Sequence, residues 1–576
     1  MRTLLRRLGL LSLLCLFLPA SCLAQKDPFA NRLPPKTWLY LEWHGTGNLG
    51  SAKRTNSLLR LWADPAFAPV RDLITGQFYE EAKRDPKLAN LSGEDITELF
   101  SIFENPLAAG LIESEPNPEN SSGTSNPKQP WRPKGYFFVF DATGKAEGLQ
   151  KLYARFKAER TATEPITSFA VGPTTVDKIV EADETYYQAQ VGNYFLRSDE
   201  IEMMKELIPR FRSEEAPANS LAQTTEYQQA RKQVRSDALL EFFVRIPHLS
   251  KMKFPQKSKF DAAAFIKALH LEQIRLACGS LSFAADGTRL HSAVLGDTSK
   301  GGLFDILGES GPTFSTLALA PAGASYNVSR LNLTALYQLV REAVIAATPD
   351  GRAEFEKYEA VGQMAFGMKP AEMLQLFGGE FATIKSNPDD PSDFLFATTI
   401  LDRGRVVGLL DRMLANSIAT EDREGETNYI ELSIPYRDTQ TRTQRRRFYS
   451  VAVTRDVALV APHKTETRDA LAALAKQSGA APAARLASDA DFLRARTALP
   501  QDLSGMAYTD LTRLQWDKVY SDLLHGKAGT KGTNEQKKIE TALQGFDPKV
   551  LSRYLRVLIS GTWKDSSGAY FDLLLQ

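Results

Sequence analysis

The sequence predicts an α+β protein of two homologous halves, each a mainly antiparallel sheet with covering helices. Three observations point to this fold class: one long stretch occurs twice, hairpin signals recur, and helices fall between strands without strict βαβ alternation. The repeated stretch runs from residue 216 to 249 and aligns without a gap on residues 481 to 514, an offset of 481 − 216 = 265. Such self-similarity indicates a tandem duplication.

The repeated stretch has the pattern of a helix, a turn and a strand. Three apolar pairs recur in both copies at i, i+3 and i+7, the spacing of one helix face. The pairs are Tyr227/Phe492, Ala230/Ala495 and Val234/Leu499. An alternating run follows in the first copy, and one side of the predicted strand carries Leu240, Phe242, Val244 and Ile246.

The elements of the first half follow from local patterns. Strands come from short aromatic and β-branched runs, helices from apolar residues spaced by 3.6, and turns from Gly192-Asn193 and Asp286-Gly287. Ser92 and Asp95 have capping-box spacing. In chain order the elements are a strand at 38–41, helices at 58–62 and 92–100, a strand at 136–140, a helix at 149–156, a hairpin of 187–191 and 194–197, a helix at 201–208 and a hairpin of 274–283 and 289–295.

The second half repeats this order. Its predicted elements are a strand at 326–328, a helix at 333–340, a helix ending near Phe377, a strand at 394–398, a helix at 409–414, a hairpin of 449–453 and 457–460, a helix at 471–474 and a hairpin of 555–563 and 570–575. The offset falls from 321 − 35 = 286 to 394 − 136 = 258 and returns to 568 − 287 = 281. These changes indicate one loop insertion in each half.

The resulting domain organisation has a leader, two repeats and a short linker. It comprises a signal peptide at 1–24, a first α+β repeat at 25–300 with a disordered loop at about 113–133, a linker at 301–312, and a second α+β repeat at 313–576 with a Gly/Lys-rich loop at about 525–538.

The first residues have the layout of a secretory signal peptide. Three arginines within the first seven residues precede an apolar run from Leu8 to Leu18 and then small residues. We expect cleavage after Ala24; the alternative is lipidation of Cys22, because Leu18 to Cys22 is similar to a lipobox. No second apolar segment of ~20 residues follows, so no integral span is expected in the mature chain. The protein is therefore expected to be exported, periplasmic or secreted, or lipid-anchored through Cys22.

Charge and cysteine content exclude some partners and bonds. The 576 residues carry a formal net charge of +1 at pH 7, which gives no electrostatic reason to expect nucleic acid as a partner. Cys15 and Cys22 lie in the leader, so Cys278 is alone in the mature chain and cannot form an intramolecular disulfide. Its apolar surroundings favour a buried small hydrophobe over a nucleophile.

The arrangement is similar to a known kind of family. The Leu33-Pro34 before a strand, the helix ending near Leu376 to Glu380 and the hairpin after Tyr449 resemble uncharacterised bacterial families of exported, internally duplicated α+β proteins, known as domains of unknown function. The resemblance covers almost the whole mature chain. It implies export and a noncatalytic or unknown role, and it brings no catalytic residues.

One motif suggests a nucleotide site. Gly45-Thr46-Gly47-Asn48-Leu49-Gly50 satisfies G-x-G-x-x-G and follows a strand. A dinucleotide site also needs a parallel strand ending in an acid ~20 residues later, and the chain has a helix pattern there. A flexible surface turn is the better interpretation, and no cofactor is expected.

Nucleophilic catalysis would need a Ser or Cys with a positioned histidine and an acid. None of the histidines stands in a recognisable catalytic motif: His44, His248, His270, His291, His463 and His525. We expect His270 within a helix and His525 within the inserted loop. The sequence therefore predicts no catalytic residue.

Two charged clusters have structural explanations. The acidic run from Asn387 to Asp393 offers oxygen ligands, but its two prolines and its lack of EF-hand residues favour a solvated turn over a metal site. Arg442, Arg445, Arg446 and Arg447 fit an exposed strand start facing Glu424 or Glu426 better than a nucleic-acid patch. No metal site is expected.

Three functions are compatible with these patterns. The favoured hypothesis is an exported, noncatalytic binding or scaffold protein of the cell envelope, with an envelope protein or a ligand as partner. The alternatives are an envelope hydrolase with a site between the two halves, and a carrier of an apolar ligand.

Overall fold

We describe a computed structural model of the chain. It describes residues 29–84, 92–112, 135–158, 166–180, 185–247, 261–390, 393–414, 419–437, 444–475, 485–525, 541, 543 and 545–576. The chain forms two compact units. The first unit comprises Met1–Pro255, Arg275–Ala293 and Leu524–Val550, and the second comprises Gln256–Ile274, Val294–Leu523 and Leu551–Gln576.

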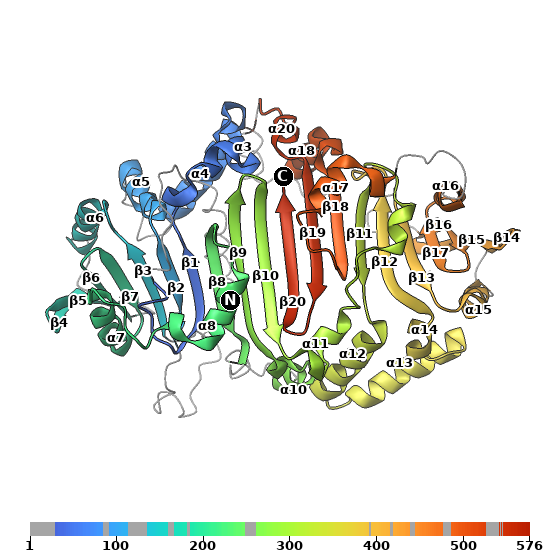
Figure 1. The fold of residues 1–576 in the computed structure, drawn as a ribbon, viewed down its shortest axis with the longest axis horizontal. Coiled ribbons are helices and arrows are strands. Elements are labelled where there is room, and N and C mark those ends of the chain that lie inside the picture. The colour runs from blue at the N-terminus through green and yellow to red at the C-terminus, as the bar shows by residue number, and fades with distance from the viewer. Residues whose placement is uncertain are drawn as a thin grey trace. The chain divides into compact units, whose positions relative to one another are not determined.

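The first unit contains an antiparallel sheet. Its strands are β1 (Thr37–Trp43), β2 (Leu107–Ile112), β3 (Tyr136–Asp141), β4 (Ile166–Val171), β5 (Thr174–Val180), β6 (Thr185–Val191), β7 (Tyr194–Ser198), β8 (Ala238–Arg245) and β9 (Ile274–Ala284), followed by β10 (Gly287–Gly296). Neighbouring strands pair in the order β4-β5-β6-β7-β3-β2-β1-β8-β9, and every pair is antiparallel. This arrangement puts β1 between β2 and β8 in the middle of the sheet (Figure 1).

The second unit repeats this strand order. Its strands are β11 (Ser325–Arg330), β12 (Phe377–Lys385), β13 (Leu395–Ile400), β14 (Ala419–Glu424), β15 (Thr427–Arg437), β16 (Gln444–Val453), β17 (Val457–Ala461), β18 (Gly505–Asp510), β19 (Val557–Lys564) and β20 (Gly568–Leu575). They pair in the order β14-β15-β16-β17-β13-β12-β11-β18-β19-β20, again antiparallel throughout. The two units have the same pairing order: adding ten to each strand number of the first unit gives the order of the second, which continues with β20.

Helices separate the strands in both units. Those of the first unit are α2 (Ala52–Thr55), α3 (Ser57–Ala63), α4 (Ala68–Arg84), α5 (Gly93–Ser101), α6 (Ala146–Ala158), α7 (Ile201–Arg212) and α8 (Thr225–Gln233). Those of the second are α10 (Ala262–Ala268), α11 (Leu303–Ile306), α12 (Leu333–Ala347), α13 (Gly351–Phe366), α14 (Pro370–Leu374), α15 (Arg403–Leu414), α16 (Lys464–Ala475) and α17 (Ala490–Arg496). Two further helices are α18 (Trp516–His525) and α20 (Val550–Tyr554).

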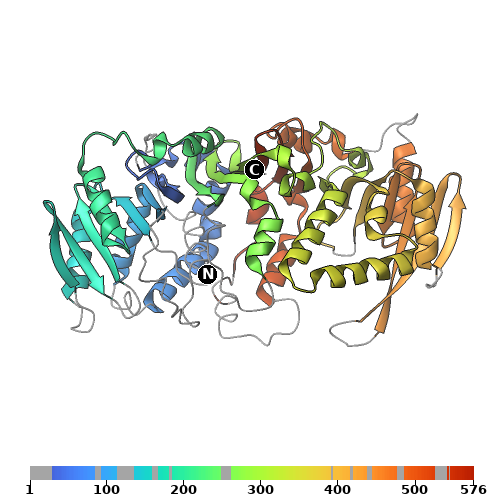
Figure 2. The same cartoon turned by 90° about the horizontal axis from the view of Figure 1, so that it is seen from below.

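Packing of helices on strands forms the cores. In the first unit, α8 contacts β8, and Tyr227 of α8 packs edge to face on Tyr40 of β1 and Phe243 of β8. In the second unit, α12 and α13 contact one another (Figure 2), and Phe492 of α17 packs edge to face on Tyr508 of β18. Each large apolar side chain buried in this way stabilises the fold by about 2–3 kcal/mol.

The predicted fold class is confirmed as α+β with antiparallel strands. The capping box of Ser92 and Asp95 is present, and the hairpin at Gly192 joins β6 to β7 with Gly192 at φ 59°. One boundary was wrong: the helix expected to end near Phe377 ends at Leu374, and Phe377 begins β12. The sequence also missed six strands, β2, β4, β5, β12, β14 and β15.

Several predictions lie outside the described residues. They are the signal peptide with Ala24 and Cys22, the loop at 113–133, and residues 526–538 of the Gly/Lys-rich loop. None of the helices within the described parts of the chain is both long enough and apolar enough to cross a membrane.

Candidate functional site

Two carboxylates face each other in the interior of the first unit. Glu42 of β1 and Glu241 of β8 are direct cross-strand partners, and their exposed fractions are 0% and 2%. Apolar neighbours place them there: both strands are central and consist largely of aromatic and aliphatic residues, and Glu241 lies on the more buried side of β8. Like charges directly opposite each other in a sheet are destabilising unless a cation balances them.

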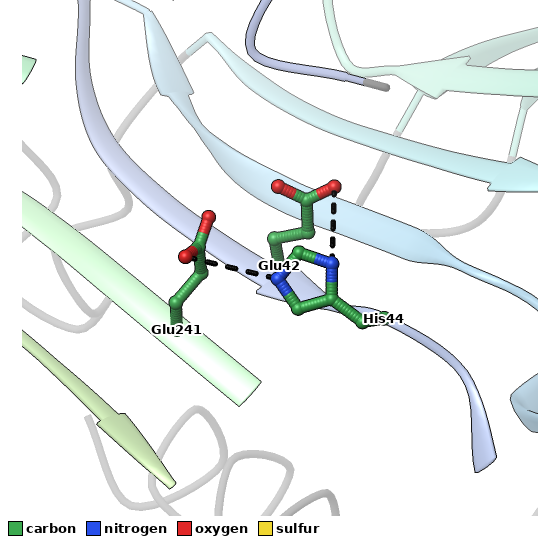
Figure 3. A group of neighbouring side chains, drawn as sticks. All are labelled: Glu42, His44 and Glu241. Carbon is green, nitrogen blue, oxygen red and sulfur yellow. Dashed lines mark ion pairs between the residues drawn. The ribbon is translucent and has the colours of Figure 1, made fainter. Parts of the chain in front are cut away.

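His44 lies between the two carboxylates (Figure 3). Its Nδ1 is 3.9 Å from Oε1 of Glu42, and its Nε2 is 3.7 Å from Oε2 of Glu241. The residue follows directly after β1, and its backbone N–H donates to the carbonyl of Leu239 at 2.8 Å, which fixes its position beside β8. The imidazole is therefore held within reach of both acids.

A second layer of polar groups surrounds the acids. The Tyr40 hydroxyl donates to Oε2 of Glu42. Tyr227 and Arg231, four residues apart on the α8 face toward β8, donate to Glu241 at 3.3 Å and 3.0 Å. We call Tyr40, Glu42, His44, Tyr227, Arg231 and Glu241 the acid–histidine cluster.

Local charges shift the pKa values within this cluster. Burial raises the pKa of the Glu241 carboxyl, but His44 and Arg231 outweigh burial, so its pKa lies below the ordinary value. Burial and the negative charge of Glu42 raise the pKa of Tyr40 well above its usual range. Glu241 is therefore held as a carboxylate, and Tyr40 as a hydroxyl that donates.

The donor set of the cluster is compatible with a metal ion. One ligand atom from each of Glu42, His44 and Glu241 can be chosen so that all three lie within 4.8 Å of one another. One imidazole and two carboxylates are ligands that zinc accepts. The Arg231 guanidinium contacts the Glu241 carboxylate, as a hydrogen-bond donor outside the ligand set of a metal site would.

The first unit also contains a cavity of about 500 Å³ beside α6. Its wall combines rings and amides: Phe140 and Phe195 stack with centroids 5.0 Å apart, and Gln150 donates to Gln190 at 2.9 Å. Pockets that bind small ligands have similar volumes and similar mixtures of apolar and polar groups.

One carboxylate in the cavity wall is already neutralised. Asp177 accepts from the Tyr153 hydroxyl at 2.8 Å and pairs with Lys157 at 3.1 Å. Burial raises the pKa of Asp177, but hydrogen bonds from Ser168, Tyr153 and Lys157 lower it by more. The pKa of Asp177 is therefore below the ordinary value. Burial and the bond to Asp177 raise the pKa of Tyr153. This wall therefore offers little net charge to a ligand.

The glycine motif after β1 is not a dinucleotide site. β1 pairs antiparallel with both neighbours, whereas that site requires parallel strands. The prediction that this turn lies at the surface was wrong, because Thr46 is only 1% exposed. Gly45 has φ 84°, and a side chain there would clash with the backbone of Glu104. The glycine is required by packing.

The structure corrects the prediction for two of the histidines. His270 does not lie within a helix: it follows α10 in a left-handed conformation at φ 54°. His525 is the last residue of α18 and not part of a loop. His248 lies outside the described residues.

The two charged clusters are structural in their described parts. Asp389 accepts from the backbone N–H of Gln515 at 2.5 Å, so this acidic run supports a turn. The prediction that the arginines face Glu424 or Glu426 was wrong, because Arg445, Arg446 and Arg447 pair with the end of β15 that lies away from both acids. Glu424 pairs instead with Arg468. Pro391, Ser392 and Arg442 lie outside the described residues.

The prediction for Cys278 is confirmed. The thiol is 0% exposed, and burial together with the charge of Glu241 raises its pKa to about 12. It therefore stays protonated and unreactive.

The acid–histidine cluster was missed by sequence reasoning. The expected apolar side of β8, with Leu240, Phe242 and Val244, is only half-buried, whereas Glu241 and Phe243 are almost fully buried. The signal was present as a single glutamate inside each of two apolar strands, Trp-Leu-Tyr-Leu-Glu-Trp and Leu-Leu-Glu-Phe-Phe.

Comparisons with protein-family models, curated proteins and solved structures found no match for this chain.

Proposed function

We propose that this chain is an exported, noncatalytic binding protein of the cell envelope that holds a small ligand in the cavity beside α6. The observation that carries the binding role is this cavity of about 500 Å³, which is lined by stacked rings and by side-chain amides. The leader sequence, with its basic start and apolar core, supports export.

The cavity wall supports an amphipathic ligand of low charge. Phe140, Phe195 and Tyr153 offer ring surface to an apolar body, while Gln150 and Gln190 offer amide groups. Asp177 is neutralised by Lys157 and does not favour a cationic ligand. A purely apolar ligand would cover the hydrogen-bonding capacity of these amides that their mutual bond does not use, which disfavours the simple lipid carrier.

The proposal includes the origin of the two units. The gapless repeat of residues 216–249 at 481–514 and the common strand order support duplication of one ancestral α+β unit. The similarity to exported, duplicated families of unknown function supports the same history. Duplicated binding domains commonly diverge, so the cavity of one unit does not imply an identical cavity in the other.

Binding can be tested by filling the cavity. The probe is 1-anilinonaphthalene-8-sulfonate, which becomes fluorescent when its rings enter an apolar site. Ala146→Phe places a ring in the cavity wall from α6 and is expected to weaken saturable probe binding at least about tenfold. Ala365→Phe, at an exposed position of α13 in the second unit, is the matched control. Equal binding by both variants would refute the cavity as the ligand site.

Export is tested separately. Intact-mass analysis of protein purified from the native host distinguishes a free Gln25 terminus from a lipidated Cys22 terminus. A chain that retains residues 1–24 and fractionates with the cytosol would contradict export without affecting the binding test.

A further inference from the structure

Two acids of the first unit are buried side by side. Glu42 and Glu241 are 0% and 2% exposed, and Arg231 contacts Glu241 at 3.0 Å. Removing two carboxylates from water is costly unless they are paired or bind a metal ion. A divalent cation between the acids would stabilise both of them.

The ligand atoms of the cluster lie close enough to converge on one ion. One nitrogen of His44 and one oxygen of each acid lie within 4.8 Å of one another, whereas the distances of 3.9 Å and 3.7 Å involve opposite nitrogens, Nδ1 and Nε2. Metal–ligand bonds of about 2.0–2.2 Å place two ligands on one ion up to about 4 Å apart. Small rotations of the side chains in Figure 3 would direct one His44 nitrogen and one oxygen of each acid to a common point.

The groups behind the acids match the outer shell of a metal site. Tyr40 donates to Glu42, and Tyr227 and Arg231 donate to Glu241. Hydrogen bonds of this kind orient ligating carboxylates and tune the affinity for the ion. His44, with 8% exposure, is the most exposed of the three proposed ligands.

The second unit shows that the fold does not need these acids. Val328 and Met506 are direct cross-strand partners on β11 and β18, the strands that correspond to β1 and β8. They occupy the positions of Glu42 and Glu241 and are 1% and 3% exposed. A fold that accepts two apolar side chains there has no structural requirement for two charges, so the acids call for a functional explanation.

We propose that Glu42, His44 and Glu241 bind one divalent transition-metal ion of the zinc class. The donor set of one imidazole and two carboxylates favours zinc over calcium or magnesium, which prefer oxygen ligands alone. The site departs from the sequence expectation of no metal. It does not depend on the cavity beside α6 or on the proposed ligand of that cavity.

The test is a titration of the purified full chain, first treated with chelator, with zinc chloride alone. Calorimetry and thermal unfolding in the same buffer should show saturable binding of about one ion per chain and a rise in Tm with zinc concentration. His44→Ala should abolish both effects. Tyr227→Phe, which removes an outer hydrogen bond, should weaken binding by about 10–100-fold.

Two variants separate loss of binding from loss of folding. The double variant Glu42→Val/Glu241→Met carries the residues of the second unit, so it should fold and bind no zinc at this site. His270→Ala is the matched control for adventitious binding, because its ring also lies near two acids, Glu272 and Glu342, but is well exposed. It should leave the saturable site and the Tm rise unchanged.

Other results would overturn the proposal. An absence of saturable binding would show that the cluster is not a zinc site. Saturable binding that persists in the Glu42→Val/Glu241→Met chain, or that disappears with His270→Ala, would place the zinc elsewhere.

Discussion

The two units hold opposite chemistry at one pair of positions in the same strand order. In the first unit these positions are Glu42 and Glu241, with His44 and Arg231 around them. In the second they are Val328 and Met506. The backbone pairing is the same, so strand order and register do not depend on what fills this part of the core. The difference shows that one fold accommodates either a charged cluster or an apolar contact there.

The residues beside the pair differ accordingly. Arg330 is the last residue of β11 and stands two residues after Val328, as His44 stands two residues after Glu42. Arg330 pairs with Glu380, a buried carboxylate that also accepts from the backbone and hydroxyl of Thr316 at 2.8 Å each. The second unit therefore buries one acid with its own permanent cation and several donors. The first unit buries two acids around a titratable ring.

The largest effect on stability is expected when a carboxylate is introduced into the apolar pair of Val328 and Met506. Met506→Glu would bury a carboxylate opposite Val328, in an apolar pair that is 1% and 3% exposed. We expect a loss of about 3–5 kcal/mol in the free energy of unfolding, measured by urea denaturation. Met506→Leu, which nearly conserves volume, should cost less than about 1.5 kcal/mol. Similar costs for the two variants would show that this core tolerates charge.

Removing the cation beside Glu241 should give the next effect. Arg231→Met keeps an unbranched apolar side chain and loses the donor at 3.0 Å, at an expected cost of about 2–3 kcal/mol. The control is Arg494→Met on α17, which breaks a similar pair with Asp491 at 2.9 Å. The Asp491 side chain is 38% exposed against 3% for Glu241, so the control should cost less than about 1 kcal/mol. An equal loss of stability in the two variants would show that burial of the carboxylate does not decide the strength of these ion pairs.

The tyrosines at matching positions of β1 and β11 provide a finer comparison. Tyr40 donates to the carboxylate of Glu42, whereas Tyr326 bonds to the neutral hydroxyl of Thr316 at 2.8 Å. Tyr40→Phe is expected to cost about 2 kcal/mol and Tyr326→Phe about 1 kcal/mol, because bonds to charged groups are stronger. Chemical denaturation of both variants measures the difference, and the reverse order would mean that Glu42 is not charged.

The smallest effect concerns pH and a third position that differs between the units. Asp199 follows β7, and burial with the negative charge of Glu200 raises its pKa to about 7. The corresponding residue after β17 is Pro462, which does not titrate. As pH rises from about 4 to about 7, the unfolded chain ionises Asp199 while the folded chain keeps the proton, so stability falls across this window.

The variant Asp199→Asn should remove this fall. It keeps an oxygen to accept from Gly135, and at pH 7 it should stabilise the first unit by on the order of 1–2 kcal/mol, after allowance for partial exposure. At pH 4 the gain should vanish. Thermal unfolding at both pH values measures it, and a gain that does not change with pH would contradict the raised pKa.

Much of the fold was determined by the sequence alone. The capping box at Ser92, the hairpin at Gly192 and the helix face of Tyr227 and Ala230 depend on residues close together in the chain, so local patterns predicted them. The antiparallel α+β class followed from recurring hairpins. β2 and β12 were missed because their sequences, Leu-Ala-Ala-Gly-Leu-Ile and Phe-Gly-Gly-Glu-Phe-Ala-Thr-Ile-Lys, contain several glycines and alanines, which weaken the strand pattern.

The tertiary structure alone decided the acid–histidine cluster. Glu42 and Glu241 are 241 − 42 = 199 residues apart in the sequence, and only the pairing of β1 with β8 makes them neighbours. Alternation in β8 suggested one apolar side, but α8 covers the other side, so a glutamate that would otherwise face solvent is buried. Burial and charge balance depend on which elements pack together, and that information lies in contacts between distant segments, not in local spacing.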